Sequence, residues 1–194
     1  MPSAESHLGA DFFSRSVHVV ARDLVGCCLL YDGCGGTIVE TESYERNDPA
    51  CHAYVGLTER TEVLFGPPGR AYVYLSYGIH SLLNAVAEPE GEAAAVLIRA
   101  LQPTHGLEAM RKRRGARSDT ELCSGPGKLT EALGIGLEAN GADLTQDPFL
   151  LMPRPDGWDA EIVAGPRVGI TKAIERPWRF SLASSPFVSR PRPA

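Results

Sequence analysis

Three polar side chains alternate along one short stretch of the chain, at Glu40, Glu42 and Tyr44. β-branched residues dominate the first half of the stretch 37–44, which predicts a strand, and residues two apart on a strand share a face. A buried carboxylate costs several kcal/mol unless it is paired, so it usually has a partner or a chemical task. The alternative is an edge strand with both glutamates in water. The stretch alone favours that alternative, because glutamate is mostly exposed.

Two polar residues in other apolar stretches could complete such a site. Arg99 comes near the end of the stretch 94–100, and a guanidinium there is a natural partner for a buried Glu42. Asn84 lies in the stretch 81–87, where a lone amide needs its hydrogen bonds satisfied. This amide could stabilise the core or face a ligand pocket.

Tyrosines gather around a tight connection at residues 76–80. Tyr77 lies in it beside Gly78, and Tyr74 lies in the middle of the preceding predicted strand. A large ring exposed at a turn needs something to meet, and a nucleic-acid base is one candidate because every base has a π-face. Ordinary core packing with a bonded hydroxyl is the alternative for Tyr72 and Tyr74, and it is weaker for Tyr77.

The bulk composition is that of a soluble globular protein. The chain has 194 residues, of which 43% are hydrophobic and 22% charged, which suits a single domain. We expect residues 1–10 to be a disordered lead and residues 11–190 to form the domain. No apolar run is long enough to span a bilayer, so no membrane partner is expected. Residues 1–10 lack a signal-peptide pattern, which indicates the cytoplasm of a bacterium or the nucleus of a eukaryote.

The cysteines predict neither a disulfide framework nor a metal site. The five cysteines are an odd number, which indicates reduced thiols packed as small hydrophobes. Cys28, Cys34, Cys51 and His52 could be assembled into a zinc site on paper, but their spacing fits no common zinc pattern.

Charge argues against a nucleic-acid binder overall and leaves local patches open. The net charge is −5, which is the wrong sign for such a protein. Local patches decide phosphate binding, however. Residues 111–117 are strongly basic, although a solvated helix face is the favoured interpretation of that run. A looser set comprises Arg176, Arg179, Arg190 and Arg192.

The predicted elements are short and are separated by proline and glycine. The patterns predict helices over 11–24, 106–114 and 128–133, a further short helix over 59–64, and strands over 25–30, 37–44, 71–75, 81–87, 94–100, 168–170 and 179–182. Strands outnumber helices and short turns join them, so antiparallel pairing is favoured over a parallel βαβ sheet. The expected class is therefore a mixed α/β (α+β) fold.

Several motifs in register resemble the alkyladenine (3-methyladenine) DNA glycosylase family. They occur in the order Glu42-Ser43-Tyr44, His52, residues 72–78, Asn84, residues 97–100, residues 122–129 and residues 166–170. The resemblance covers about residues 12–188. It implies a single domain with a curved antiparallel β-sheet surrounded by helices.

The resemblance also assigns roles. Glu42 would be the general base that activates water, and Arg99 would help to hold that water together with a backbone carbonyl near Val168. Tyr77 would be the wedge that enters the duplex. The pocket for the flipped base would be lined by Tyr44, His52, Tyr74, Asn84 and Leu97.

The implied activity is removal of damaged purines from double-stranded DNA. Substrates would be alkylated or deaminated purines: 3-methyladenine, 7-methylguanine, hypoxanthine or ethenoadenine. The enzyme would be a monomer that hydrolyses the base–sugar bond without a covalent intermediate or strand cleavage, since no matched role falls to a nucleophilic lysine. It would need no metal and no cofactor. Thr61 and Leu64 depart from the family pattern and leave base preference open.

Two other function classes compete with this hypothesis. One is a nucleic-acid-binding module without catalysis, and intact Glu42 and Arg99 speak against it. The other is a hydrolase or transferase that acts on small nucleotides or nucleosides. The basic run and Tyr77 at a hairpin tip favour a polymer substrate over that second class.

Overall fold

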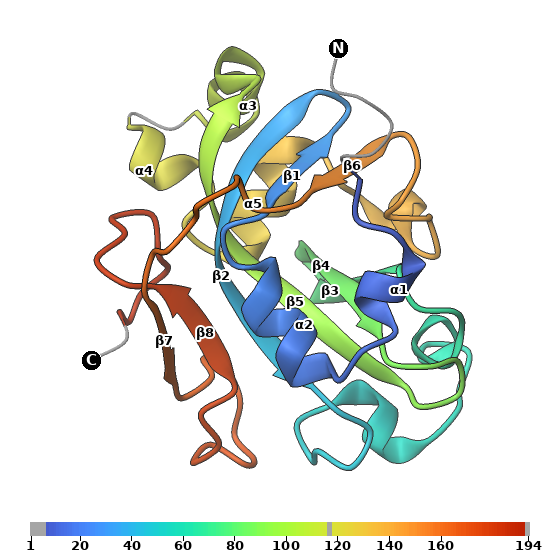
Figure 1. Ribbon diagram of the computed structural model, residues 1–194. Helices are drawn as coiled ribbons and strands as arrows, with labels where there is room; N and C mark the ends of the chain where they lie inside the picture. Colours follow the sequence, from blue (N-terminus) through green and yellow to red (C-terminus); the bar gives the residue numbers. More distant parts are fainter. Residues whose placement is uncertain (1–6, 116–117, 193–194) are drawn as a thin grey trace.

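One curved antiparallel sheet of eight strands organises the molecule. The computed structural model describes residues 7–115 and 118–192 (Figure 1). The main path runs in the order β3-β4-β5-β2-β1-β6, and β8 pairs with both β2 and β7. The strands are β1 (Cys28–Tyr31), β2 (Cys34–Tyr44), β3 (Ala71–Ser76), β4 (His80–Ala87), β5 (Ala94–His105), β6 (Phe149–Met152), β7 (Ile162–Gly165) and β8 (Arg179–Leu182). The predicted α+β class with a curved antiparallel sheet is confirmed.

Short helices cover the sheet and fill its connections. The α-helices are α1 (Ala10–Phe13), α2 (Val17–Leu24), α3 (Leu107–Arg114), α4 (Asp119–Leu122) and α5 (Pro126–Leu133). Three 3₁₀ turns complete the described elements: η2 (His52–Val55), η3 (Glu62–Phe65) and η4 (Leu137–Ala139). Within residues 7–115 and 118–192, no helix is long and apolar enough to cross a membrane.

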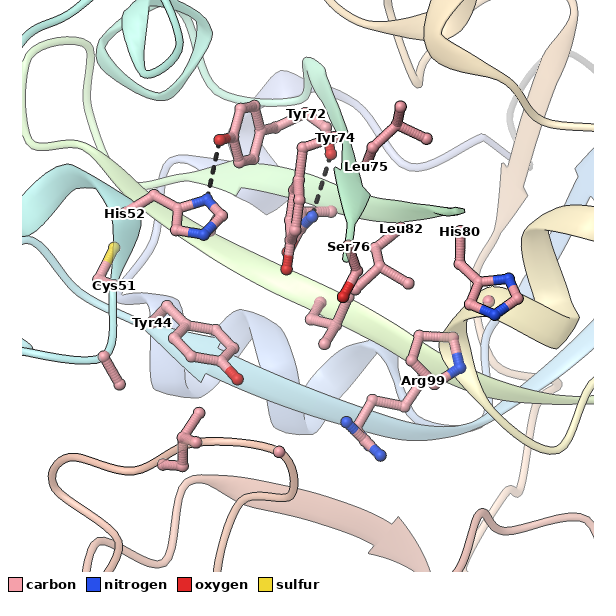
Figure 2. A pocket seen from close by; sticks show the side chains of 18 of the residues that line it. Tyr44, Cys51, His52, Tyr72, Tyr74, Leu75, Ser76, His80, Leu82 and Arg99 are labelled. Carbon is pink, nitrogen blue, oxygen red and sulfur yellow. Dashed lines mark hydrogen bonds between the residues drawn. The ribbon is translucent and has the colours of Figure 1, made fainter. Parts of the chain in front are cut away.

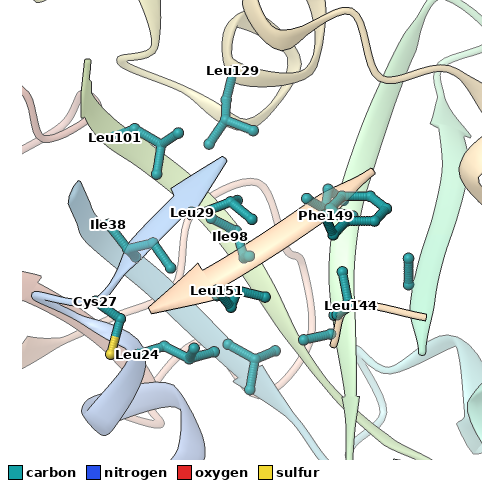
Figure 3. Packing of buried hydrophobic residues seen from close by; sticks show 14 of the residues in the cluster. Leu24, Cys27, Leu29, Ile38, Ile98, Leu101, Leu129, Leu144, Phe149 and Leu151 are labelled. Carbon is teal, nitrogen blue, oxygen red and sulfur yellow. The ribbon is translucent and has the colours of Figure 1, made fainter. Parts of the chain in front are cut away.

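The main core lies where α2 and α5 pack against the sheet. The buried side chains of α2 are Val17, Val20, Ala21 and Leu24, a spacing that places them on one helix face. They meet large apolar side chains of the strands, and α5 adds Leu129 (Figure 3). The resulting apolar layer packs against β2 and β5, the strands that carry Glu42 and Arg99.

β2 is an interior strand along its length. Its first half pairs with β1 and its second half with β8, while β5 lies along its other side. Glu40 and Glu42 are consequently 0% exposed. The edge-strand alternative, with both glutamates in water, is therefore wrong.

The elements differ from the sequence prediction in several places. The predicted helix 11–24 is split into α1 and α2, and the four-residue strand β6 was not predicted. Residues 168–170 form a loop instead of a strand, because Pro166 lacks an amide donor and Gly169 has a φ of +79°. The strand of this region lies earlier, at β7.

Ordered structure starts before the boundary that we expected at residue 11. Leu8 is buried, and its amide donates to the Leu151 carbonyl at 2.9 Å. Ala10 begins α1. The rest of the expected lead, residues 1–6, and Arg117 of the basic run lie outside the described residues.

Candidate active site

A cavity of about 510 Å³ opens beside the ends of β2 to β5, which is the size of ordinary small-molecule pockets. Strands, the η2 turn and the loop 166–170 all contribute to its wall (Figure 2). Eight of the residues singled out from the sequence line it: Tyr44, His52, Tyr74, Tyr77, Asn84, Leu97, Arg99 and Val168. Glu42 does not, because it lies directly behind this wall and is fully buried.

Glu42 is held by three groups that themselves line the cavity. Its Oε1 accepts the backbone N–H of Val168 at 2.7 Å and forms an ion pair with Arg99 Nη1 at 3.2 Å. Its Oε2 accepts the Tyr44 hydroxyl at 2.7 Å. A carboxylate oxygen can accept about two hydrogen bonds, and among the described residues Oε2 accepts only the Tyr44 hydroxyl, so it can accept a further donor.

Val168 reaches Glu42 through a different backbone group than the resemblance implied. The contact is made by its N–H, whereas a carbonyl was expected near this residue to hold water. Gly169, in the left-handed region, follows it and turns the chain along the cavity wall. The loop thus fixes the carboxylate directly.

Tyr44 keeps its hydroxyl proton. Burial, reinforced by the charge of Glu42 and by the hydrogen bond to it, raises the pKa of Tyr44 well above its usual value. The ring also has a cation behind it, because the Arg167 guanidinium lies 4.6 Å from the ring centroid. Tyr44 is therefore a fixed donor to Glu42 and a fixed flat wall.

Arg99 lies between two buried carboxylates. Its Nε donates to Glu40 Oε1 at 2.9 Å, and its Nη1 faces Glu42. Burial alone would lower the pKa of Arg99, but the charges of Glu42 and Glu40 outweigh it and raise that pKa. The arginine stays charged, so the predicted pairing with Glu42 is present in the structure.

His52, Tyr72 and Tyr74 form an aromatic group on the other side of the cavity. His52 Nδ1 lies 2.9 Å from the Tyr72 hydroxyl, and its ring meets Tyr74 edge-on at 4.5 Å (Figure 2). Arg60 Nη2 lies 3.3 Å from His52 Nε2. A guanidinium can only donate, so Nε2 accepts and Nδ1 carries the proton. Burial raises the pKa of Tyr74 to about 12, which keeps this wall uncharged.

The pKa of His52 gives a testable pH dependence. Burial, aided by the charge of Arg60, lowers that pKa from 6.5 to about 4. Between these values the unfolded chain binds a proton on His52 that the folded chain refuses, so the free energy of unfolding falls as pH drops through this window. We expect the His52 ring signal in an NMR titration to move near pH 4. A midpoint near 6.5, assigned by its loss in His52→Gln, would contradict this.

Asn84 and Leu97 form the floor from adjacent strands. They face each other in the β4–β5 register, and Leu97 also faces Glu42 in the β2–β5 register. Asn84 Nδ2 donates to the Tyr72 carbonyl at 3.1 Å. That bond fixes the amide plane at the cavity.

Tyr77 stands out from the β3–β4 hairpin. It has a φ of +51° and Gly78 one of +69°, and the Ile79 amide closes the turn on the Ser76 carbonyl at 3.1 Å. Positive φ at both central residues is typical of the hairpin turn that matches strand twist. Tyr77 is 90% exposed and Ile79 73%. The hairpin therefore presents an apolar tip at the mouth of the cavity.

The possible zinc site of the sequence is not assembled. All five cysteines are described, and all carry free thiols. Across the described residues, no group of three or more His, Cys, Asp or Glu side chains could hold a metal ion. The cavity offers aromatic faces and hydrogen-bond donors, and the buried Glu42 carboxylate lies directly behind its wall.

Comparison with known proteins decides the family. A sequence profile of methylpurine-DNA glycosylases matches residues 11–186. The chain belongs to the methylpurine-DNA glycosylase family. It is therefore a hydrolytic DNA glycosylase, and its substrate is DNA.

Bacterial relatives match nearly the whole chain. A protein of Rhodopseudomonas palustris is 60% identical over 94% of this chain and 87% of its own length. One of Bradyrhizobium diazoefficiens is 56% identical over 94% and 90%, and one of Nitrosospira multiformis 54% identical over 93% and 92%. All three are provisionally named 3-methyladenine DNA glycosylases. The hypothesis of a binding module without catalysis is not supported by this family.

Several residues that organise the site were given no role in it from the sequence, although Glu40 was placed on the face of Glu42. They are Glu40, Asp48, Arg167, Arg179 and Ser189, all of which are buried and bonded around Glu42, Tyr44 or Arg99. Arg167 could have been predicted, because it precedes Val168 in the motif 166–170 that carries part of the family resemblance. The others contact their partners across long sequence separations.

Proposed function

We propose that this glycosylase removes alkylated purines, foremost 3-methyladenine, and that Glu42 activates the attacking water. The supporting observation is that Glu42 Oε2 can accept a further donor beside the Tyr44 hydroxyl, among the described residues, directly behind a cavity of small-molecule size. The Tyr44 hydroxyl and the Val168 amide donate to the carboxylate and Arg99 pairs with it, which holds it still. A general base must lie within hydrogen-bond reach of the proton it takes.

The proposed reaction is a direct displacement at the sugar C1′. Water donates a proton to Glu42 as its oxygen bonds to C1′, and the C1′–N bond breaks with its electron pair passing to the base. An alkylated purine carries a positive charge and leaves as a neutral base, so one carboxylate suffices where sugar hydrolysis usually uses two. The products are the free base and an unbroken strand with an abasic site of inverted configuration.

The cavity walls support recognition of a flat base. Tyr44 and the pair His52 and Tyr74 point toward one another from different elements (Figure 2). Aromatic faces bind bases by stacking, with about 1–3 kcal/mol per base. All three side chains are uncharged at neutral pH by the pKa directions above, so a cationic base meets no repelling charge from them. Deaminated or etheno purines, which are neutral, would be slower substrates.

Tyr77 is the proposed wedge in the duplex. A base inside DNA must be flipped out to reach such a cavity, at a cost of a few kcal/mol. A side chain inserted at the vacated step offsets part of that cost. Tyr77 is nearly fully exposed, and its turn places it at the mouth of the cavity.

We propose that the protein acts as a monomer on the DNA of a bacterial cytoplasm.

The test is release of a single lesion from duplex DNA by the native chain. We expect release of 3-methyladenine or 7-methylguanine, with no cleavage of the strand until the abasic site is opened by alkali. Equal release from the corresponding free nucleoside would favour a small-nucleoside hydrolase. Strand cleavage without alkali would overturn the monofunctional reaction, and no release from any damaged purine would overturn the proposed substrate class.

A further inference from the structure

Ser189 places a hydroxyl between Arg99 and Glu40. It follows β8 near the C-terminal end of the described chain and is 3% exposed. Its Oγ accepts Arg99 Nη2 at 3.1 Å and donates to Glu40 Oε1 at 2.9 Å. The Ser189 hydroxyl thus accepts one hydrogen bond and donates another, and both of its partners are charged.

The segment that carries Ser189 is itself fixed to β2 and β8. The Ser189 amide donates to Glu40 Oε2 at 2.7 Å. Arg179 Nε donates to Glu40 Oε1 at 2.6 Å, and its Nη2 donates to the carbonyls of Ser189 at 3.3 Å and Pro191 at 2.8 Å. The charges of Glu40 and Arg179 balance each other. The hydroxyl therefore has one defined place.

These contacts leave one edge of the Arg99 guanidinium to face Glu42. The group is planar and presents its donors in a rigid fork. Glu40 holds Nε, Ser189 holds Nη2, and Nη1 lies 3.2 Å from Glu42 Oε1. Because the guanidinium is planar and rigid, the contacts that hold Nε and Nη2 also fix the direction in which Nη1 points.

We propose that Ser189 is a positioning residue for base release: its hydroxyl orients Arg99, and through Arg99 it orients Glu42. The proposal rests on the proposed roles of Glu42 and Arg99. Ser189 lies beyond residue 186, where the family match ends, so the C-terminal segment adds to the site from outside the matched region. A loss of orientation at a reacting group slows the chemical step without weakening substrate binding.

Ser181 is a matched control. It lies on β8 opposite Glu40 in the β2–β8 register and is 0% exposed. Its Oγ has no hydrogen-bond partner within the described part of the chain. Removing this hydroxyl deletes the same atom from the same buried region and leaves the Arg99 contacts in place.

The experiment compares Ser189→Ala, Ser189→Cys and Ser181→Ala with the native chain. It measures the single-turnover rate of base release from a duplex with one 7-methylguanine, the Kd for that duplex, and the thermal midpoint. We expect both Ser189 variants to release base about 10- to 100-fold more slowly, with a Kd within about twofold of native. Ser181→Ala should release base at the native rate.

Cysteine separates hydrogen bonding from packing. A thiol is somewhat larger than a hydroxyl, so it leaves no cavity, but it is a weak donor and acceptor. Recovery of the native rate in Ser189→Cys, or equal rates in Ser189→Ala and Ser181→Ala, would overturn the proposal. If Ser189→Ala lowers the thermal midpoint more than Ser181→Ala does, the rate of base release by Ser189→Cys, compared with the native rate, decides the test.

The same assay keeps the two proposals apart. Full activity in Glu42→Gln would overturn the proposed base, whatever Ser189 does. Loss of activity in Glu42→Gln together with native rates in both Ser189 variants would overturn only the role of Ser189.

Discussion

Glu42→Gln is expected to slow base release from lesion DNA by about 10²- to 10⁴-fold, the usual contribution of a general base. Glutamine has the same shape as glutamate but cannot take a proton from water. The affinity for lesion DNA should stay near native, because Glu42 does not line the cavity and makes its contacts within the protein. The single-turnover rate and the Kd for the lesion duplex measure these two effects separately.

The substitution should leave the fold intact. The amide oxygen of glutamine can still accept the Val168 N–H, and the amide nitrogen can donate to the Tyr44 hydroxyl oxygen. Arg99 keeps its bonds to Glu40 and Ser189. A slow but well-folded variant that binds lesion DNA is therefore the expected result.

Glu45→Gln is the charge-matched control. Glu45 follows the same strand, but its carboxylate is about one-third exposed and faces His18 and Arg176. Its loss removes one negative charge close to the site without touching Glu42, so the rate should stay within about twofold of native. Native activity in Glu42→Gln would move the role of the base to another group. Equal slowing in both variants would mean that the loss of one negative charge, and not the loss of a general base, slows base release.

Part of the site could be predicted from the residues alone because strand geometry is simple. Alternation along β2 was enough to place Glu42 and Tyr44 on one face, and their hydroxyl-to-carboxylate bond agrees with it. An arginine in an apolar strand needs an anion, and Arg99 meets two of them. Tyr77 could be placed at a turn because glycine follows it. These inferences used only local pattern and the cost of burying charge, whereas His52, Tyr74 and Leu97 were placed at the pocket by the family resemblance.

The supporting residues could not be predicted in this way. Ser189 lies 149 residues from Glu40, and Arg167 lies 119 from Asp48. Such contacts depend on β8 pairing with the second half of β2, and nothing in either segment specifies that partner. The loop at Val168 was mistaken for a strand because its apolar residues alternate around a glycine. Four-residue elements such as β6 are too short for periodicity to reveal.

Arg167→Met is expected to lower the free energy of unfolding by about 3–5 kcal/mol. Arg167 and Asp48 form an ion pair whose side chains are both 0% exposed. Removal of the guanidinium leaves the Asp48 carboxylate buried, with Arg176 at 3.8 Å as a more distant and partly exposed charged partner. Arg167 Nη1 also donates to the Ser43 carbonyl at 3.1 Å, and the guanidinium lies over the rings of Tyr44 and Trp178. Urea denaturation followed by tryptophan fluorescence or circular dichroism measures the loss.

Arg176→Met provides the comparison. Arg176 also lies over Trp178, at 4.4 Å, and approaches Asp48 to 3.8 Å, but its side chain is 31% exposed. Water replaces its ion pairs when it is removed, so we expect a loss of about 1 kcal/mol or less. Equal losses in the two variants would mean that burial of the Arg167–Asp48 pair adds nothing.

The double variant Arg167→Met with Asp48→Asn separates the pair from the packing around it. If the unpaired charge causes the loss, neutralising Asp48 should recover part of it, and the double variant should lose less than the sum of the two single losses. The part not recovered measures the stacking on Tyr44 and the bond to Ser43. Because Tyr44 is both a cavity wall and the donor to Glu42, that remaining part should also slow base release. Additive losses with native release would mean that Arg167 stabilises the fold without supporting the site.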